Sequence, residues 1–215
     1  MRHQVFIVWF IIFLLWSIYR VNFFRPEWID ELLVKPIIYV FPIIYIVRIK
    51  EKLKFKELGL ISSLKDVFVD IFIGVIIGIL FAFEGLYSNY VKYGRFSFLP
   101  LDTIKLSGGI IFFLLINLIS SIWEEILGRG YIYQRLFKQS DRQFESALIS
   151  SFLFLLLHIP IIFTRLHLMG VSLVIYIFSI IILGVTNCYL FSLRKSLVLP
   201  VLIHTFWNMT VALYL

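Results

Sequence analysis

The fold class is set by stretches such as IIFFLLINLISSIWEEILGR, which occupies residues 110–129. Similar apolar runs fill most of the chain, because 61% of its 215 residues are hydrophobic and only 15% are charged. Soluble domains contain about 45–50% apolar and about 25% charged residues, and so short a chain has too little interior to bury the excess. Backbone groups in lipid need partners within their own helix. We therefore predict an all-α, polytopic transmembrane bundle.

Charged and polar residues divide the chain into about seven apolar runs, each close to the length of about 20 residues that crosses a bilayer as a helix. The predicted helices are residues 4–24, 31–48, 67–87, 103–127, 145–163, 168–193 and 196–215. The first run lacks the small-residue cleavage site of a signal peptide, so we expect it to remain as a span. The chain is thus predicted to be an integral, multi-pass membrane protein.

The net charge of +7 comes from basic residues that gather on one side of the predicted bundle. The connection at residues 48–65 is a basic loop that holds Arg48 and several lysines. The positive-inside rule then predicts that the N-terminus and this loop lie in the cytoplasm and the C-terminus outside. We expect the loop to contact anionic lipid headgroups. We expect no nucleic-acid partner, because the charge is spread over short loops, and a single cysteine, Cys188, allows no internal disulfide.

Five polar side chains lie inside apolar runs, where each is costly unless it is paired or functional. They are Glu124 and Glu125 in the fourth run, His158 in the fifth, and His204 and Asn208 in the seventh. A single residue of this kind is often no more than a polar contact between helices. Two carboxylates, two histidines and an amide on three helices together favour a buried functional site.

Helical spacing separates these groups. Arg129 follows Glu125 by four residues, the favourable order for an ion pair on one helix face, so we expect these two to pair. Glu124 points about 100° away from Glu125 and is left for another partner. His204 and Asn208 are also four residues apart, so both side chains emerge from one face.

The depth of this polar site depends on the length of the fourth helix. If that helix continues to about Phe137, Glu124 lies about 20 Å from the basic side, as His158 does on the fifth helix. If the helix ends at Gly128, Glu124 lies near the surface instead. On the first alternative the polar groups meet in the inner half of the bundle, and we predict a site toward the cytoplasmic side.

The polar residues form three short motifs. They are Glu124-Glu125-x-x-x-Arg129, Phe154-x-x-x-His158 and His204-x-x-x-Asn208, in this order on separate apolar runs. Together they resemble the signature of the CAAX-protease and bacteriocin-processing family of intramembrane endopeptidases. The first hundred residues carry no such resemblance. We therefore divide the chain into N-terminal membrane helices, residues 1–102, and a catalytic four-helix membrane core, residues 103–215.

The resemblance implies an endopeptidase that cleaves membrane-proximal peptide bonds, in CAAX-type processing or in the processing of leader or pheromone peptides. By position, Glu124 and His158 match the pair that activates water, and His204 and Asn208 match the pair that stabilises the oxyanion. Arg129 matches the basic residue that supports the glutamate motif. The residue types suit these roles, because a carboxylate can act as a general base and imidazole and amide N–H groups can bind an oxyanion.

Metal dependence is open from the sequence. Glu124, His158 and His204 match the ligands of some catalytic zinc sites. The zinc-protease spacings H-E-x-x-H and H-x-x-E-H are both absent, however, and Glu125 is already assigned to Arg129. We favour a mechanism without a metal or other cofactor, with zinc as the alternative.

Two other classes of function fit the same residues. A non-catalytic bacteriocin-immunity or scaffold protein would keep the motifs as contacts between helices. A proton-coupled transporter would also bury carboxylates and histidines, but the chain shows none of the repeats or broken helices typical of transporters. The expected partners are membrane lipid and a peptide or protein substrate presented near the membrane, and the sequence predicts no oligomeric state.

Overall fold

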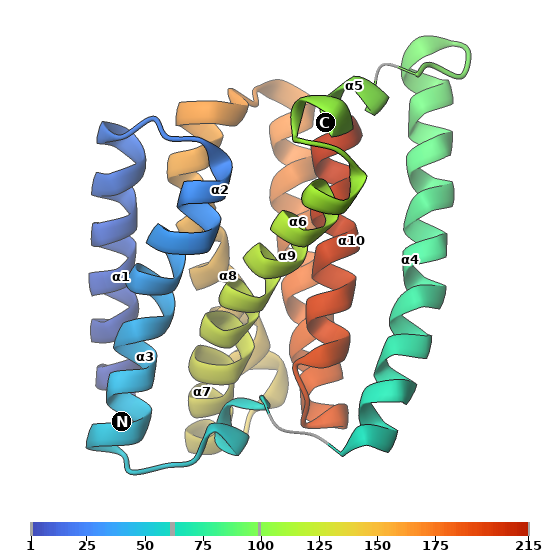
Figure 1. The fold of residues 1–215 in the computed structure, drawn as a ribbon. Helices are drawn as coiled ribbons and strands as arrows, with labels where there is room; N and C mark the ends of the chain where they lie inside the picture. The colour runs from blue at the N-terminus through green and yellow to red at the C-terminus, as the bar shows by residue number, and fades with distance from the viewer. Residues whose placement is uncertain (1, 61–62, 99, 215) are drawn as a thin grey trace.

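The computed structural model describes residues 2–60, 63–98 and 100–214, and within these ranges the chain is helical with no β-strand. The helices form a bundle of passes that run up and down side by side (Figure 1). Six helices are long and apolar enough to span a membrane, and a shorter apolar helix covers Val198–Leu213. The predicted fold class, an all-α membrane bundle of about seven spans, is confirmed.

The N-terminal region supplies three passes. They are α1 (Arg2–Asn22), a continuous helix over Glu27–Lys50, and α4 (Leu64–Tyr93). The second pass combines α2 (Glu27–Ile29) and α3 (Phe41–Tyr45) with π-helical turns at Asp30–Val34, Pro36–Val40 and Ile46–Lys50. Pro36 and Pro42 lie in this pass and have no N–H to donate, so regular α-helical hydrogen bonding cannot run through them. A 3-10 turn at Phe55–Leu58 lies in the loop before α4.

The C-terminal region supplies the other four passes. Its α-helices are α5 (Pro100–Leu106), α6 (Ile110–Glu125), α7 (Gln134–Ser140), α8 (Gln143–Ile161), α9 (Gly170–Arg194) and α10 (Val198–Tyr214). A π-helical segment, Ile126–Tyr133, joins α6 and α7 into one pass, and another, Ile162–Leu166, extends α8.

The predicted helix over 103–127 is wrong at both ends. Gly108 and Gly109 have φ angles of 93° and 95°, which glycine adopts at no steric cost, and they separate α5 from α6. At the other end the helix continues to Ser140, because the residues beyond the glutamates still bury an apolar face against the bundle. The longer of the two alternatives is therefore correct, and Glu124 lies deep in the bundle.

Small residues bring the helices close enough to form a buried site. A Cβ atom on Gly78 of α4 would lie only 2.4 Å from the ring of Phe206 on α10. In the same way, a Cβ on Gly184 of α9 would lie 2.5 Å from Oγ of Ser151 on α8. Packing of this kind replaces the hydrophobic effect as the force that holds helices together in lipid.

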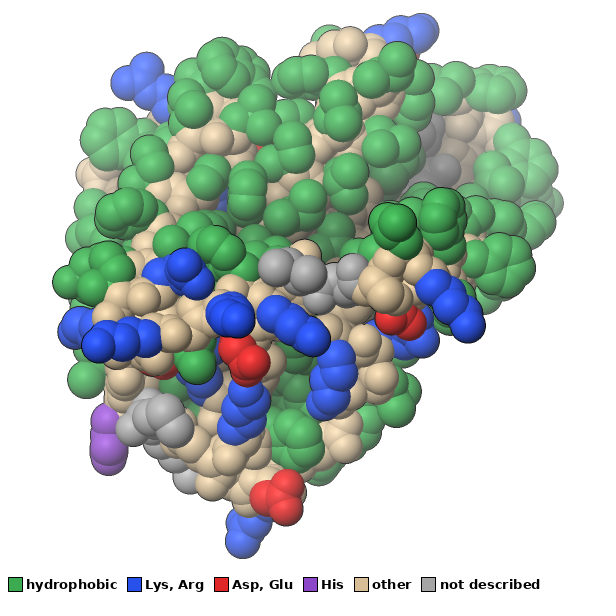
Figure 2. Space-filling model, turned by 60° about the horizontal axis from the view of Figure 1, so that its bottom comes forward, with side chains coloured by type: hydrophobic (Ala, Val, Ile, Leu, Met, Phe, Trp, Pro, Cys, Tyr) green, Lys and Arg blue, Asp and Glu red, His purple; other side chains and the backbone are tan. Residues whose placement is uncertain are grey.

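The two ends of the bundle differ in charge. The connecting residues 51–60, 141–142 and 195–197 lie at the end where α1 begins, and Figure 2 shows Lys and Arg side chains gathered over this end. Here Lys138 donates a hydrogen bond of 2.8 Å to Glu57 and holds the pKa of that carboxyl below its usual range. The C-terminus lies at the opposite end (Figure 1). The predicted one-sided distribution of basic loops is therefore present in the fold.

Candidate active site

The three motif-bearing passes bring their polar residues together at Glu124. This residue lies at the end of α6, His158 lies near the end of α8, and His204 lies in the first half of α10. Oε2 of Glu124 is 3.6 Å from Nε2 of His158 and 3.4 Å from Nε2 of His204. Oε2 of Glu124 and Nε2 of His204 are buried and make no hydrogen bond within the described part of the chain. Each of these two atoms therefore keeps an unused hydrogen-bonding position.

Phe154, the first residue of the second motif, orients His158. Nδ1 of His158 lies 3.0 Å from the carbonyl oxygen of Phe154. Because a carbonyl oxygen only accepts, this contact assigns the proton to Nδ1. In the neutral imidazole, Nε2 then carries the lone pair and faces Glu124. The Phe154 ring also packs edge-on against both histidines, with centroid distances of 4.6 Å to His158 and 5.6 Å to His204.

Glu125 lies in a separate buried network on the other side of His204. Its Oε1 accepts a hydrogen bond of 2.8 Å from Nη1 of Arg129, as predicted, and one of 3.0 Å from Nδ2 of Asn187. Nδ1 of His204 is 2.8 Å from the same oxygen. The two adjacent glutamates point in different directions and yet contact the two nitrogens of one imidazole. His204 is thereby fixed with Nε2 toward Glu124.

Asn208 lies one turn beyond His204 on the same face of α10. Its Nδ2 donates a hydrogen bond of 3.2 Å to Oγ of Ser121 on α6. An amide nitrogen carries two hydrogens, so one remains for another acceptor. Asn208 is half-buried and lines the pocket that Glu124 and His158 also line.

The N-terminal region adds two charged side chains that sequence analysis did not assign to the site. Nζ of Lys35 is 2.7 Å from Oε1 of Glu124, 2.8 Å from Oγ of Ser120 and 2.5 Å from Oε2 of Glu31. Lys35 and Glu31 lie near the start of an apolar run, where charged residues usually need no explanation beyond the membrane interface. The signal that could have identified them is their spacing, an acid four residues before a base. Asn187, within a predicted helix, was missed as well.

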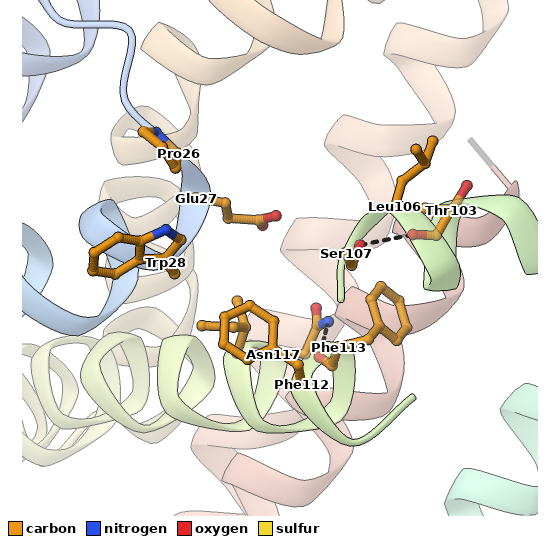
Figure 3. A pocket seen from close by; sticks show the side chains of 10 residues that line it. Pro26, Glu27, Trp28, Thr103, Leu106, Ser107, Phe112, Phe113 and Asn117 are labelled. Carbon is orange, nitrogen blue, oxygen red and sulfur yellow. Dashed lines mark hydrogen bonds between the residues drawn. The ribbon is translucent and has the colours of Figure 1, made fainter. Parts of the chain in front are cut away.

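A pocket of about 320 Å³ leads away from Glu124. Its lining includes Glu27 at the start of the second pass, Arg165 at the end of the α8 pass and Ala212 near the end of α10. A second pocket of about 320 Å³ adjoins it, because Glu27 and Asn117 line both. In Figure 3, Glu27 points from α2 into the space between α2 and α5. The site is thus connected to the end of the bundle that carries the C-terminus.

The position of this opening bears on the predicted side of the active site. The sequence predicted the basic loops in the cytoplasm and the active site toward the same side. The structure has the basic loops at one end of the bundle, and the lining of the pocket extends from Glu124 toward the other end. The side of the membrane that the active site faces stays a prediction, because distances along single helices give the depth of a residue but not the direction in which the helices leave room for a pocket.

The surroundings of Glu124 bear on whether a metal ion takes part. No group of three or more His, Cys, Asp or Glu side chains in the described ranges is placed to hold a metal ion. Of the possible ligands, Glu124 already binds the Lys35 ammonium through Oε1, and a metal cation beside that ammonium would be repelled. Metal dependence stays a prediction: we favour a mechanism without a metal, with zinc held by Glu124, His158 and His204 as the alternative.

The region that carries the three motifs matches a known protein family. Residues 106–210 match the family model described as type II CAAX prenyl endopeptidase Rce1-like. Over this region the chain is similar to that family. The match confirms the resemblance to CAAX proteases predicted from the motifs, and it includes every motif residue from Glu124 to Asn208. No curated protein and no solved structure matches the chain significantly.

The similarity to the Rce1-like family agrees with the membrane-spanning fold. The family consists of CAAX-type endopeptidases of the membrane, and the chain is an integral membrane protein with several apolar helices. Contact with lipid and a peptide substrate near the membrane agree with both observations. The matched residues do not include the second pass, which supplies Glu31 and Lys35.

Proposed function

We propose that the protein is an intramembrane endopeptidase in which Glu124 and His158 activate water to cleave a membrane-proximal peptide bond. The observation that carries the proposal is the position of Oε2 of Glu124, which faces Nε2 of both histidines at 3.6 and 3.4 Å inside a pocket. The Rce1-like family supports a CAAX-type peptide as the substrate, with a prenylated cysteine before the cleaved bond.

In the proposed first step, a water molecule binds between Oε2 of Glu124 and Nε2 of His158. Glu124 takes one proton from the water while the water oxygen attacks the carbonyl carbon of the peptide bond. The electron pair of the C=O double bond moves to the oxygen, which becomes the oxyanion of a tetrahedral intermediate. A positioned acid–base group of this kind accelerates a reaction by about 10²–10⁴-fold.

His204 and Asn208 are the proposed donors to the oxyanion. Nδ1–H of His204 is directed to Glu125, so a second donor on Nε2 requires the imidazolium form. Asn208 has one amide hydrogen beyond the one it gives to Ser121. Donors fixed in advance in a site that excludes water stabilise developing charge strongly.

In the proposed second step, the intermediate collapses and the C–N bond breaks. The proton held by Glu124 passes to the leaving nitrogen, which departs as an amine. The new carboxylic acid keeps the water oxygen and the second proton of the water. Glu124 returns to its starting carboxylate, so the reaction consumes one water and needs no other reactant.

The test is a cleavage assay with the purified protein in liposomes. The probe is a quenched fluorescent peptide that ends in a farnesylated Cys-aliphatic-aliphatic-X sequence, compared with the same peptide without the farnesyl group. We expect the wild-type protein to release the last three residues, identified by mass spectrometry, and the Glu124→Gln variant to release almost none. If the wild-type protein cleaves neither peptide, the proposed endopeptidase function is wrong, and a scaffold or immunity role is favoured.

We also propose that the basic end faces the cytoplasm, as the positive-inside rule indicates, so that the pocket opens on the opposite side. Single cysteines at Ser63 and at Ser140, in a Cys188→Ala background, report on this end. We expect both to resist an impermeant thiol reagent added outside intact cells. Ready labelling of both would reverse the orientation and bring the pocket opening to the cytoplasmic side, as the sequence predicted for the active site.

A further inference from the structure

The charge nearest to Glu124 comes from outside the three motifs. Lys35, on the second pass, is 4% exposed, and its Nζ binds Oε1 of Glu124 at 2.7 Å. We propose that Lys35, held in place by Glu31, is a positioning residue for Glu124. It fixes Oε1 and so leaves Oε2 as the oxygen that takes the proton from water. This inference rests on the proposed function and adds a fourth element to the active site.

The hydrogen bonds of Glu124 are unequally divided between its two oxygens. Oε1 accepts from both Nζ of Lys35 and Oγ of Ser120, at 2.7 and 3.2 Å. Oε2 accepts from no group in the described part of the chain and faces the two histidines. A carboxylate held through one oxygen cannot rotate freely about its last bond. The other oxygen is therefore kept in one direction, as a base that must reach a particular proton requires.

Glu31 has the complementary position on the other side of Lys35. Its Oε2 is 2.5 Å from Nζ, and both residues lie at or beside the π-helical turn over Asp30–Val34. Such turns are frequent at functional sites. Nε1 of Trp123, the residue before Glu124, donates a hydrogen bond of 3.0 Å to the backbone oxygen of Glu31. The second pass is thus tied to α6 beside the catalytic glutamate, and the ammonium is held between two carboxylates.

The charges of Glu31, Lys35 and Glu124 explain why the test must substitute Lys35 and Glu31 together. With Glu31 and Glu124 ionised and Lys35 protonated, the three side chains carry a net charge of −1. Removal of Lys35 alone would leave two buried carboxylates facing each other, which is strongly unfavourable. Removal of the charges of Lys35 and Glu31 together leaves Glu124 alone and keeps the net charge at −1. The double variant therefore separates the positioning of Glu124 from the stability of the cluster.

The experiment compares Lys35→Met, the double variant Lys35→Met/Glu31→Gln and Lys35→Arg in the farnesyl-peptide assay, with thermal unfolding measured in detergent. We expect the double variant to fold but to lose about 100-fold in kcat, the loss typical of a misplaced catalytic group, with KM little changed. Lys35→Arg retains a donor to Oε1 and should recover part of kcat. Arg135→Met is the matched control. Arg135 lies in α7, away from Glu124, and the substitution removes a cation from its buried pair with Glu51.

The outcomes separate this inference from the proposed function. If Glu124→Gln is inactive while the folded double variant keeps the wild-type kcat, Lys35 does not position Glu124, and the inference is wrong. If Arg135→Met lowers kcat of the folded protein as much as the double variant does, the effect is structural, and the inference is also wrong. If Glu124→Gln itself cleaves at the normal rate, the proposed function fails first. A low kcat in the double variant, with partial recovery in Lys35→Arg, supports the positioning role.

Discussion

The N-terminal and C-terminal regions differ in how visible their share of the site is in the sequence. The C-terminal region places Glu124, His158 and His204 well inside apolar helices, where an ionisable residue needs a reason. The N-terminal region places Lys35 near the start of an apolar run, where a lysine is ordinary. In the fold, Lys35 and Glu124 are both buried, 4% and 7% exposed, and they bind each other. The place of a charged residue within an apolar run thus predicts its burial less well than the packing of the helices does.

Two ion pairs can be compared in the same way, one buried in the bundle and one exposed at its basic end. Glu125 and Arg129 pair inside the bundle with side chains 0% and 1% exposed. Glu57 and Lys138 pair at the basic end with side chains 40% and 54% exposed, at the same N–O distance of 2.8 Å. Their distances are equal, so burial alone should separate their effects. The predictions below test which charges belong to the site and which only to the surface.

The largest effect is expected for Glu124→Gln. Glutamine keeps an acceptor for Lys35 but cannot take a proton, so kcat should fall by about 10²–10⁴-fold while the melting temperature stays close to that of the wild type. Glu57→Gln, which alters an exposed carboxylate far from the pocket, is the control and should retain activity. A purified Glu124→Gln protein that cleaves at the normal rate would remove Glu124 from the reaction.

A large loss of stability is expected for Arg129→Ala. The substitution leaves Glu125 buried beside His204 and Asn187 without its cation, and breaking a buried pair in this way costs about 3–5 kcal/mol. The loss of stability is measured by thermal unfolding in detergent, with circular dichroism as the signal. An unchanged melting temperature together with lost cleavage would instead indicate that Arg129 acts on the substrate.

A small effect is expected for Lys138→Ala. Exposed pairs contribute about 0–1 kcal/mol, so the free energy of unfolding should change little. The Glu57 pKa is lowered by Lys138, so the contribution is present above the ordinary carboxyl pKa and is lost as the pH falls through the lowered value. The difference in melting temperature between this variant and the wild type should therefore disappear in acid. A difference that grows in acid would contradict this interpretation of the pair.

No effect is expected from removal of metal ions. Glu124 is bound to Lys35 in the structure, and the proposed reaction uses only side chains and water. Prolonged chelation should therefore leave the purified enzyme active. Metal content is the measurement that decides, because a chelator can also block a membrane-embedded groove. About one zinc per active protein, lost together with activity in His158→Ala, would overturn the mechanism without a metal.

The sequence determined the class of the molecule and the residues of its three motifs. The excess of apolar residues requires a membrane bundle, since backbone groups in lipid leave helices as the solution for runs of this length. Local spacing was sufficient for Glu125 and Arg129, because two residues four apart on one helix meet whatever the rest of the chain does. The resemblance of the motifs rested on the same local order and agrees with the family match.

The tertiary structure decided what depends on neighbours distant in the chain. The break before α6 follows from two glycines that a continuous apolar pattern had hidden. The pairing of Lys35 with Glu124 joins residues 89 positions apart, and no periodicity within one helix can indicate it. The end at which the pocket opens depends on how several passes lie against one another. Local spacing fixes which side chains share a helix face, but only the packing of helices decides what those faces meet.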